Sequence, residues 1–72
     1  GHAKLVGHRY EAAIEDFNQA LKLDPYYANV YHNRGNCYIQ LGDNLKACDD
    51  FARAYEIDPD PITQRAIELF CQ

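Results

Sequence analysis

The residues of this sequence that could do chemistry are its histidines and cysteines, which metal sites and nucleophilic catalysis often use. They are His2, His8, His32, Cys37, Cys48 and Cys71. A zinc site needs about four converging ligands, and none of these residues forms a closely spaced pair, so we expect no metal and no cofactor. The cysteines are odd in number and lack metal-ligand spacing. We therefore interpret them as reduced thiols of an intracellular protein, with Cys37 and Cys48 as small buried side chains rather than nucleophiles.

Length and charge exclude several functions. The chain has 72 residues, too few to enclose both a large cofactor and a substrate, so we expect no enzyme. Its net charge is −4 and its basic residues are scattered, which disfavours nucleic acid. Tyr27, Tyr31 and Tyr38 could stack on bases, but without basic neighbours they are assigned to helix packing. No apolar run reaches the roughly 20 residues of a membrane span, and no stretch is typical of a signal peptide, so we expect a cytoplasmic protein without membrane contact.

The sequence repeats itself at an interval of 34 residues, which is its most informative feature. This shift places Ala13 on Ala47, Phe17 on Phe51 and Ala20 on Ala54. The other coincidences in the same register are Gly1 on Gly35, Asp16 on Asp50, Asp24 on Asp58 and Pro25 on Pro59. So many matches in one register are hard to obtain by chance, and they indicate one structural unit written twice.

Each unit carries an apolar stripe suited to an α-helix. Ala13, Phe17 and Ala20 are spaced i, i+4 and i+7, which places them on one helix face. Alanines on either side of a phenylalanine let a second helix come close and leave a slot for the ring. Gly35 falls within the preceding helix, where a glycine costs about 1 kcal/mol relative to alanine. We expect Gly35 to mark a point where another backbone approaches closely.

Turn and capping signals divide the chain into helices. Gly42-Asp43 is a turn followed by an N-cap, two Asp-Pro pairs end helices, and Asp60-Pro61 can start another. The predicted helices are Ala3 to Val6, Tyr10 to Leu23, Tyr27 to Leu41, Asn44 to Ile57 and Pro61 to Cys71. No strand signal is present, so the predicted fold class is all-α.

These features resemble the tetratricopeptide repeat, a helix-turn-helix unit of 34 residues that stacks into an α-solenoid. The residues that carry the resemblance are Tyr31, Gly35, Tyr38, Ala47, Phe51, Ala54 and Pro59 in a complete unit, and Ala13, Phe17, Ala20 and Pro25 in a partial one. The implied organisation is a single domain, 1–72, with a partial repeat at 1–25, a complete repeat at 26–59 and an end helix at 60–72. Three residues depart from the pattern: Lys4 replaces an aromatic residue, Arg34 a leucine and Leu69 a glycine.

The resemblance implies a scaffold for protein interactions, in which the first helix of each unit lines a concave groove for a peptide or a partner's helix. The positions that would line this groove are Asn29, His32, Asn36, Ile39 and Gln40. The spacing of Asn29, His32 and Asn36 independently puts these three on one helix face, away from Tyr31 and Gly35. Amide side chains donate and accept hydrogen bonds, so they can read a peptide backbone. The alternative is a solvated polar face without a partner.

One subfamily of these repeats binds the terminal carboxylates of heat-shock chaperones through lysines, an arginine and asparagines. Asn33 and Asn36 match the asparagines of that pattern. However, His32, Thr63 and Ile67 occupy positions where basic residues are needed. We therefore do not expect this kind of ligand.

The chain has few units for a solenoid, which usually needs about three. Four apolar side chains are expected to lack a covering neighbour: Leu5, Val6, Ile14 and Leu21. We therefore expect the chain to be part of a longer array or to form a homo-oligomer, with a helix swap at the Gly7-His8 turn as one route. The second functional hypothesis follows: a structural or self-associating segment of a larger repeat protein.

Overall fold

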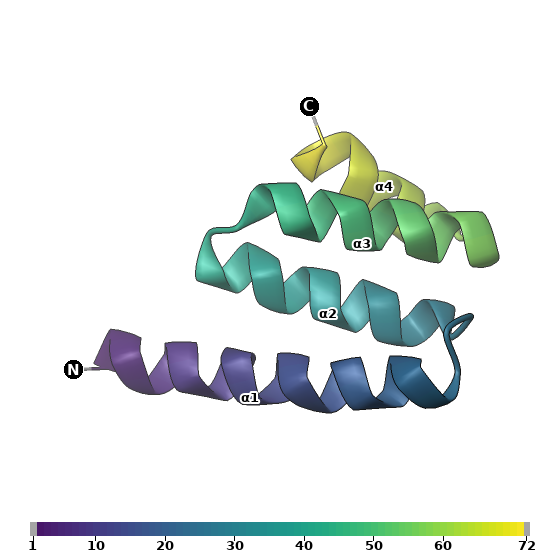
Figure 1. Ribbon diagram of the computed structural model, residues 1–72. Helices are drawn as coiled ribbons and strands as arrows, with labels where there is room; N and C mark the ends of the chain where they lie inside the picture. Colours follow the sequence, from purple (N-terminus) through teal and green to yellow (C-terminus); the bar gives the residue numbers. More distant parts are fainter. Residues whose placement is uncertain (1, 72) are drawn as a thin grey trace.

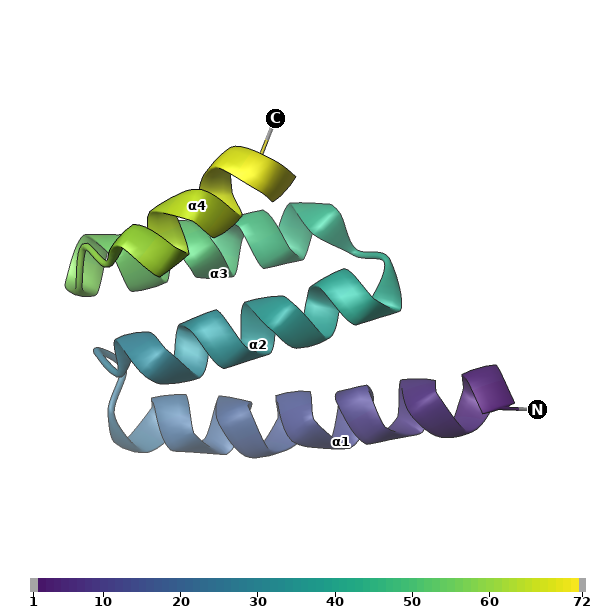
Figure 2. The same ribbon diagram turned by 180° about the vertical axis from the view of Figure 1, so that it is seen from behind.

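Four α-helices make up the fold, with no strand among residues 2–71. The computed structural model describes the backbone of residues 2–71 and the side chains of residues 9–71. The helices are α1 (His2–Leu23), α2 (Ala28–Leu41), α3 (Asn44–Ile57) and α4 (Pro61–Phe70). Each helix packs against the next along the chain, so the four form a row with α1 and α4 at its ends (Figure 1 and Figure 2). This arrangement confirms the predicted all-α fold class.

The helix ends follow the capping signals. The Asp43 carboxylate accepts a hydrogen bond from the backbone N–H of Lys46 at 3.3 Å, and that of Asp60 accepts one from the N–H of Ile62 at 2.9 Å. Gly42 ends α2 in the left-handed conformation, with φ +84°, which residues with a Cβ rarely adopt. The predicted bounds of α3 are confirmed, and those of α2 and α4 were each wrong by one residue.

The predicted break at Gly7-His8 is wrong, because α1 runs through these residues without interruption. In the repeat register, His8 and Arg9 stand where the complete unit has Gly42 and Asp43. The first unit thus lacks both the glycine that turns the chain and the aspartate that caps the next helix. A glycine inside a helix costs only about 1 kcal/mol, so Gly7 alone does not end α1. No turn exists here through which a helix could swap.

The core lies between α2 and α3 and is built around Phe51. Ala47, Phe51 and Ala54 are fully buried, as their stripe predicts. The Phe51 ring lies directly against Gly35, where a Cβ would be only 2.8 Å from Cε1 of the ring. The close neighbour of Gly35 is therefore a side chain and not the backbone that we expected. The matching residues of the partial unit are half-buried: Ala13, Phe17 and Ala20.

Arg34, which departs from the repeat pattern, connects three helices. Its Nε and Nη2 donate to the two carboxylate oxygens of Asp50 on α3, at 2.8 and 2.6 Å. Its Nη1 donates to Oδ1 of Asn18 on α1 at 2.7 Å, and its guanidinium carbon lies 5.4 Å from the centre of the Tyr31 ring. The hydrogen bonds to Asp50 raise the pKa of Arg34, so the guanidinium stays charged. A charged link therefore takes the place of a leucine contact.

The cysteines are paired differently from the prediction. Cys48 on α3 and Cys71 after α4 form a disulfide, with Cα atoms 5.3 Å apart, so they are not reduced thiols. These two residues are separated by 23 positions in the sequence and meet only because α4 packs back along α3. Residue spacing alone could not show this. Cys37 carries a free thiol and is buried.

The apolar surface of α1 is better covered than we expected. Ile14 is buried and Leu21 is half-buried, because α2 packs along this helix. The prediction that Ile14 needs a neighbour from outside the chain is therefore wrong. Leu5 and Val6 lie outside the range of described side chains.

Candidate functional site

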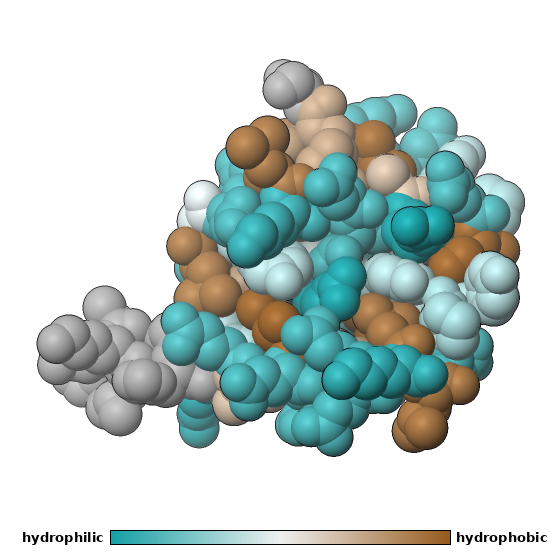
Figure 3. Space-filling view, in the orientation of Figure 1, coloured by the Kyte–Doolittle hydropathy of each residue, from teal (hydrophilic) through white to brown (hydrophobic). Residues whose placement is uncertain are grey.

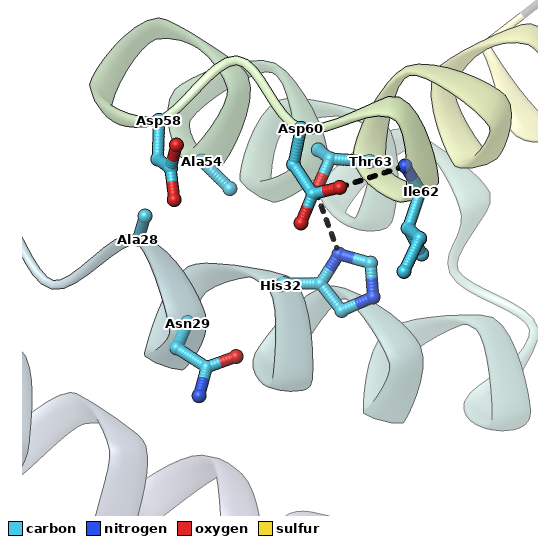
Figure 4. Close-up of a pocket in the computed structure, with 8 residues that line it drawn as sticks. All are labelled: Ala28, Asn29, His32, Ala54, Asp58, Asp60, Ile62 and Thr63. Carbon is cyan, nitrogen blue, oxygen red and sulfur yellow. Dashed lines mark hydrogen bonds between the residues drawn. The ribbon is translucent and has the colours of Figure 1, made fainter.

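A pocket of about 390 Å³ opens where the start of α2, the end of α3 and the start of α4 meet (Figure 4). The residues that line it are Ala28, Asn29, His32, Ala54, Asp58, Asp60, Ile62 and Thr63. The connection between α3 and α4 spans only residues 58–60, so α4 begins close to where α3 ends. We refer to this recess as the α2–α4 pocket.

His32 is held in the wall of the α2–α4 pocket by two contacts. Its Nδ1 is hydrogen-bonded to Oγ1 of Thr63 at 3.2 Å, which links α2 to α4. Its ring centre lies 5.3 Å from that of Phe51, which links the pocket to the core. The imidazole is consequently half-buried and fixed in position.

Two carboxylates give the pocket its charge. Asp58 is exposed and Asp60 is half-buried, and both side chains point from the α3–α4 connection toward the start of α2 (Figure 4). Asp60 uses Oδ1 to cap α4, while the Asp58 carboxylate makes no hydrogen bond or ion pair with the described residues. The lining contains no lysine or arginine. The pocket is therefore negatively charged.

The structure brings together only part of the predicted groove. Asn29 and His32 line the pocket, whereas Asn36, Ile39 and Gln40 lie farther along α2 and outside its lining. Asn36 and Gln40 are exposed, as Asn29 is, and Ile39 is half-buried. The three amide side chains make no hydrogen bond with the described part of the chain. Their donors and acceptors are therefore available to another molecule.

Sequence reasoning missed the acidic wall of the pocket. Patterns assign Asp58 and Asp60 to helix ends, which is correct for both, because Asp58 follows the last residue of α3 and Asp60 caps α4, but this does not reveal their place in the pocket. Their place in one lining with Asn29 depends on how α3 packs against α2 and α4 against α3, and residue spacing does not give that arrangement. The signal that could have found them is the run Asp58-Pro59-Asp60-Pro61, which puts two carboxylates on one short connection.

A second recess, of about 520 Å³, is lined by Tyr31, Arg34, Asp50 and their neighbours. The charges of Arg34 and Asp50 already bind each other there, so these two side chains are not available to a ligand. The buried thiol of Cys37 also has no sign of reactivity, because burial raises its pKa and keeps it protonated at neutral pH.

Neither a membrane-spanning helix nor a metal site is present among the described residues. No helix among them combines the length and the apolar character that crossing a bilayer requires. Likewise, no three histidine, cysteine or carboxylate side chains within residues 9–71 converge in a way that could hold a metal ion.

Known proteins share this repeat pattern. A family model described as "TPR repeat" matches residues 1–42, and one described as "Tetratricopeptide repeat" matches residues 28–61. The chain is 34% identical over 59 residues to "Hsp70-Hsp90 organizing protein" of Triticum aestivum, and 37% identical over 59 residues to "Tetratricopeptide repeat protein 16" of Mus musculus. It is 35% identical over 60 residues to "Protein STIP1 homolog" of Dictyostelium discoideum.

These alignments cover 82%, 82% and 83% of this chain but only 10%, 8% and 11% of the respective relatives. The chain thus spans about a tenth of the length of these relatives. The two family models together reach from the first residue to the start of α4, which includes both copies of the apolar stripe. The chain belongs to the tetratricopeptide repeat family.

Proposed function

We propose that this chain is a non-catalytic interaction module that binds a peptide, or a helix of a partner protein, on the exposed face of α2. The binding residues are Asn29, His32, Asn36, Ile39 and Gln40. The observation that carries the proposal is the free hydrogen-bonding capacity of Asn29, Asn36 and Gln40 along the exposed face of α2, next to an open pocket. Membership of the repeat family adds support, as does a relative whose name describes the organising of Hsp70 and Hsp90.

The repeat organisation of the chain and its location in the cell are also part of what we propose. We propose a partial repeat at 1–25, a complete repeat at 26–59 and an end helix at 60–72, within a single domain. We also propose a cytoplasmic location. The Cys48–Cys71 disulfide is an observation against this location, because disulfides are rare in reducing compartments. Fractionating cells that make the protein tests the location directly, and recovery from the secreted fraction would overturn it.

Selection from a random peptide display library tests the binding function. We expect the immobilised wild-type domain to enrich a set of peptides. These peptides should bind the double variant Asn29→Ala, Asn36→Ala about tenfold more weakly than they bind the wild type, since each lost hydrogen bond costs roughly 0.5 to 1.5 kcal/mol. The matched control is Gln19→Ala, Asn44→Ala, which removes two exposed polar side chains from α1 and α3 and should bind normally. Fluorescence anisotropy gives the affinities, and circular dichroism confirms that each variant is folded. Failure to enrich any peptide, or equal affinity of both variants, would refute the proposal.

The second candidate is a structural segment that associates with copies of itself, and exposed apolar residues favour it. Leu23 is 90% exposed, and Ile62 and Leu69 on α4 are 68% and 59% exposed. Hydrophobic groups also appear on the surface over α4 and near the end of α1 (Figure 3). Sedimentation velocity over a range of concentrations tests this candidate. A monomer at the highest concentration would overturn it, whereas a reversible dimer would support it.

A further inference from the structure

We propose that the α2–α4 pocket binds a lysine or arginine side chain of the partner, with Asp58 and Asp60 as the groups that recognise its charge. This inference rests on the proposed function and adds to it the chemistry of the ligand. Two aspartates on a flat surface would not define a site. Here both carboxylates face a recess with apolar groups in its lining, whereas the amide of Asn29, at the edge of that lining, is turned away from them (Figure 4).

The sign of the charge in the pocket decides between a cation and an anion. The helix N-termini at Ala28 and Pro61 each contribute roughly half of a positive charge, and the C-terminus of α3 contributes a similar negative one. These partial charges are smaller than the full negative charges of Asp58 and Asp60. The positive N-terminus of α4 is, in addition, already capped by the Asp60 carboxylate. The pocket therefore attracts a cation, and it lacks the lysines and arginines that would hold a carboxylate.

The remaining walls suit the rest of a basic side chain. Ala28 and Ile62 present apolar groups on which the alkyl part of a lysine or arginine can pack while its charged end reaches the aspartates. The hydrogen bond between His32 and Thr63 keeps this wall fixed before the ligand arrives.

Titration with N-acetyl-arginine amide, followed by nuclear magnetic resonance of the backbone amides, tests the inference without a natural partner. We expect saturable shifts at Asn29, Asp58 and Ile62. The corresponding citrulline amide has nearly the same shape without the charge, and N-acetyl-glutamate amide has the opposite charge. Neither should shift these signals. Equal shifts with arginine and citrulline would overturn the inference, as would no shift with arginine.

Charge-removing variants show whether the response belongs to this pocket. Asp58→Asn should weaken binding of the arginine probe by about fivefold, the factor that corresponds to about 1 kcal/mol. Asp60→Asn should do the same while preserving the fold, because asparagine caps a helix as well as aspartate does. The control, Asp49→Asn, removes an exposed charge that does not line this pocket and should leave binding unchanged. An equal loss in the control would show only a general attraction to an acidic protein and would overturn the inference.

The two proposals fail in different ways. If library peptides depend on Asn29 and Asn36 but contain no common basic residue, and the arginine probe does not bind, the α2 face binds its partner and this inference is wrong. If the arginine probe binds the pocket and no library peptide is enriched, the inferred charge preference stands while the proposed peptide-binding function fails.

Discussion

Replacing Arg34 by leucine should destabilise the protein, although leucine is the residue expected at this position of the repeat. The side chain of Asp50 is 7% exposed and that of Arg34 is 20% exposed. Arg34→Leu therefore leaves a buried carboxylate without its two charged hydrogen bonds. Breaking a fully buried pair costs about 3 to 5 kcal/mol, and the partial exposure of Arg34 reduces our expectation to about 2 to 3 kcal/mol. The whole free energy of unfolding for a chain of this length is about 4 to 11 kcal/mol, so the effect is large.

A double-mutant cycle followed by urea denaturation isolates this interaction. Arg34→Leu, Asp50→Leu removes both charges together and should recover most of the loss, which gives a coupling free energy of about 2 kcal/mol. Arg53→Leu, at an exposed position on α3, is the control and should change the free energy of unfolding by less than about 0.5 kcal/mol. If Arg34→Leu is as stable as the wild type, or if the coupling is near zero, then the charged link does not hold these helices together.

Three other changes test the core and the thiols. Gly35→Ala would place a Cβ 2.8 Å from the buried ring of Phe51, so we expect a loss of about 1 to 3 kcal/mol in thermal unfolding, and an unchanged melting temperature would contradict this packing. Reduction of the Cys48–Cys71 bond should cost about 3 kcal/mol, because it releases the 23-residue span between them in the unfolded chain. Mass spectrometry after alkylation checks that bond, and labelling of both cysteines without reductant would disprove it. Cys37 has a raised pKa and should react slowly with iodoacetamide until urea unfolds the protein, whereas rapid labelling of the folded chain would show that it is accessible.

Local signals predicted those parts of the fold that depend on neighbouring residues. The stripe around Phe51, the caps at Asp43 and Asp60 and the bounds of α3 all follow from spacing within one or two turns. The break at Gly7 failed because we relied on one glycine without a capping residue after it. The turn between α2 and α3 has both parts of the signal, because Gly42 and Asp43 stand together there.

The candidate site was harder to predict, because it combines residues from three helices. The periodicity of α2 put Asn29 and His32 on one face, and both line the pocket. Asp58 directly follows α3, so its place in the same lining as Asn29 depends on the packing of α3 against α2. The disulfide was missed for the same reason, since Cys48 and Cys71 are brought together by tertiary packing alone.

Phe51 connects the core to the pocket, and this limits which variants can report on binding. Its ring contacts Gly35 on one side, lies 5.3 Å from the His32 ring and stacks at 6.1 Å on Phe70 of α4. A substitution at His32 therefore removes a hydrogen bond to α4 and a contact with the core, in addition to any contact with a ligand. Asn29 has neither role, because its exposed side chain makes no hydrogen bond with the described chain. Loss of binding in a variant of His32 alone is consequently ambiguous, whereas the same loss in a folded Asn29→Ala variant identifies a direct contact with the ligand.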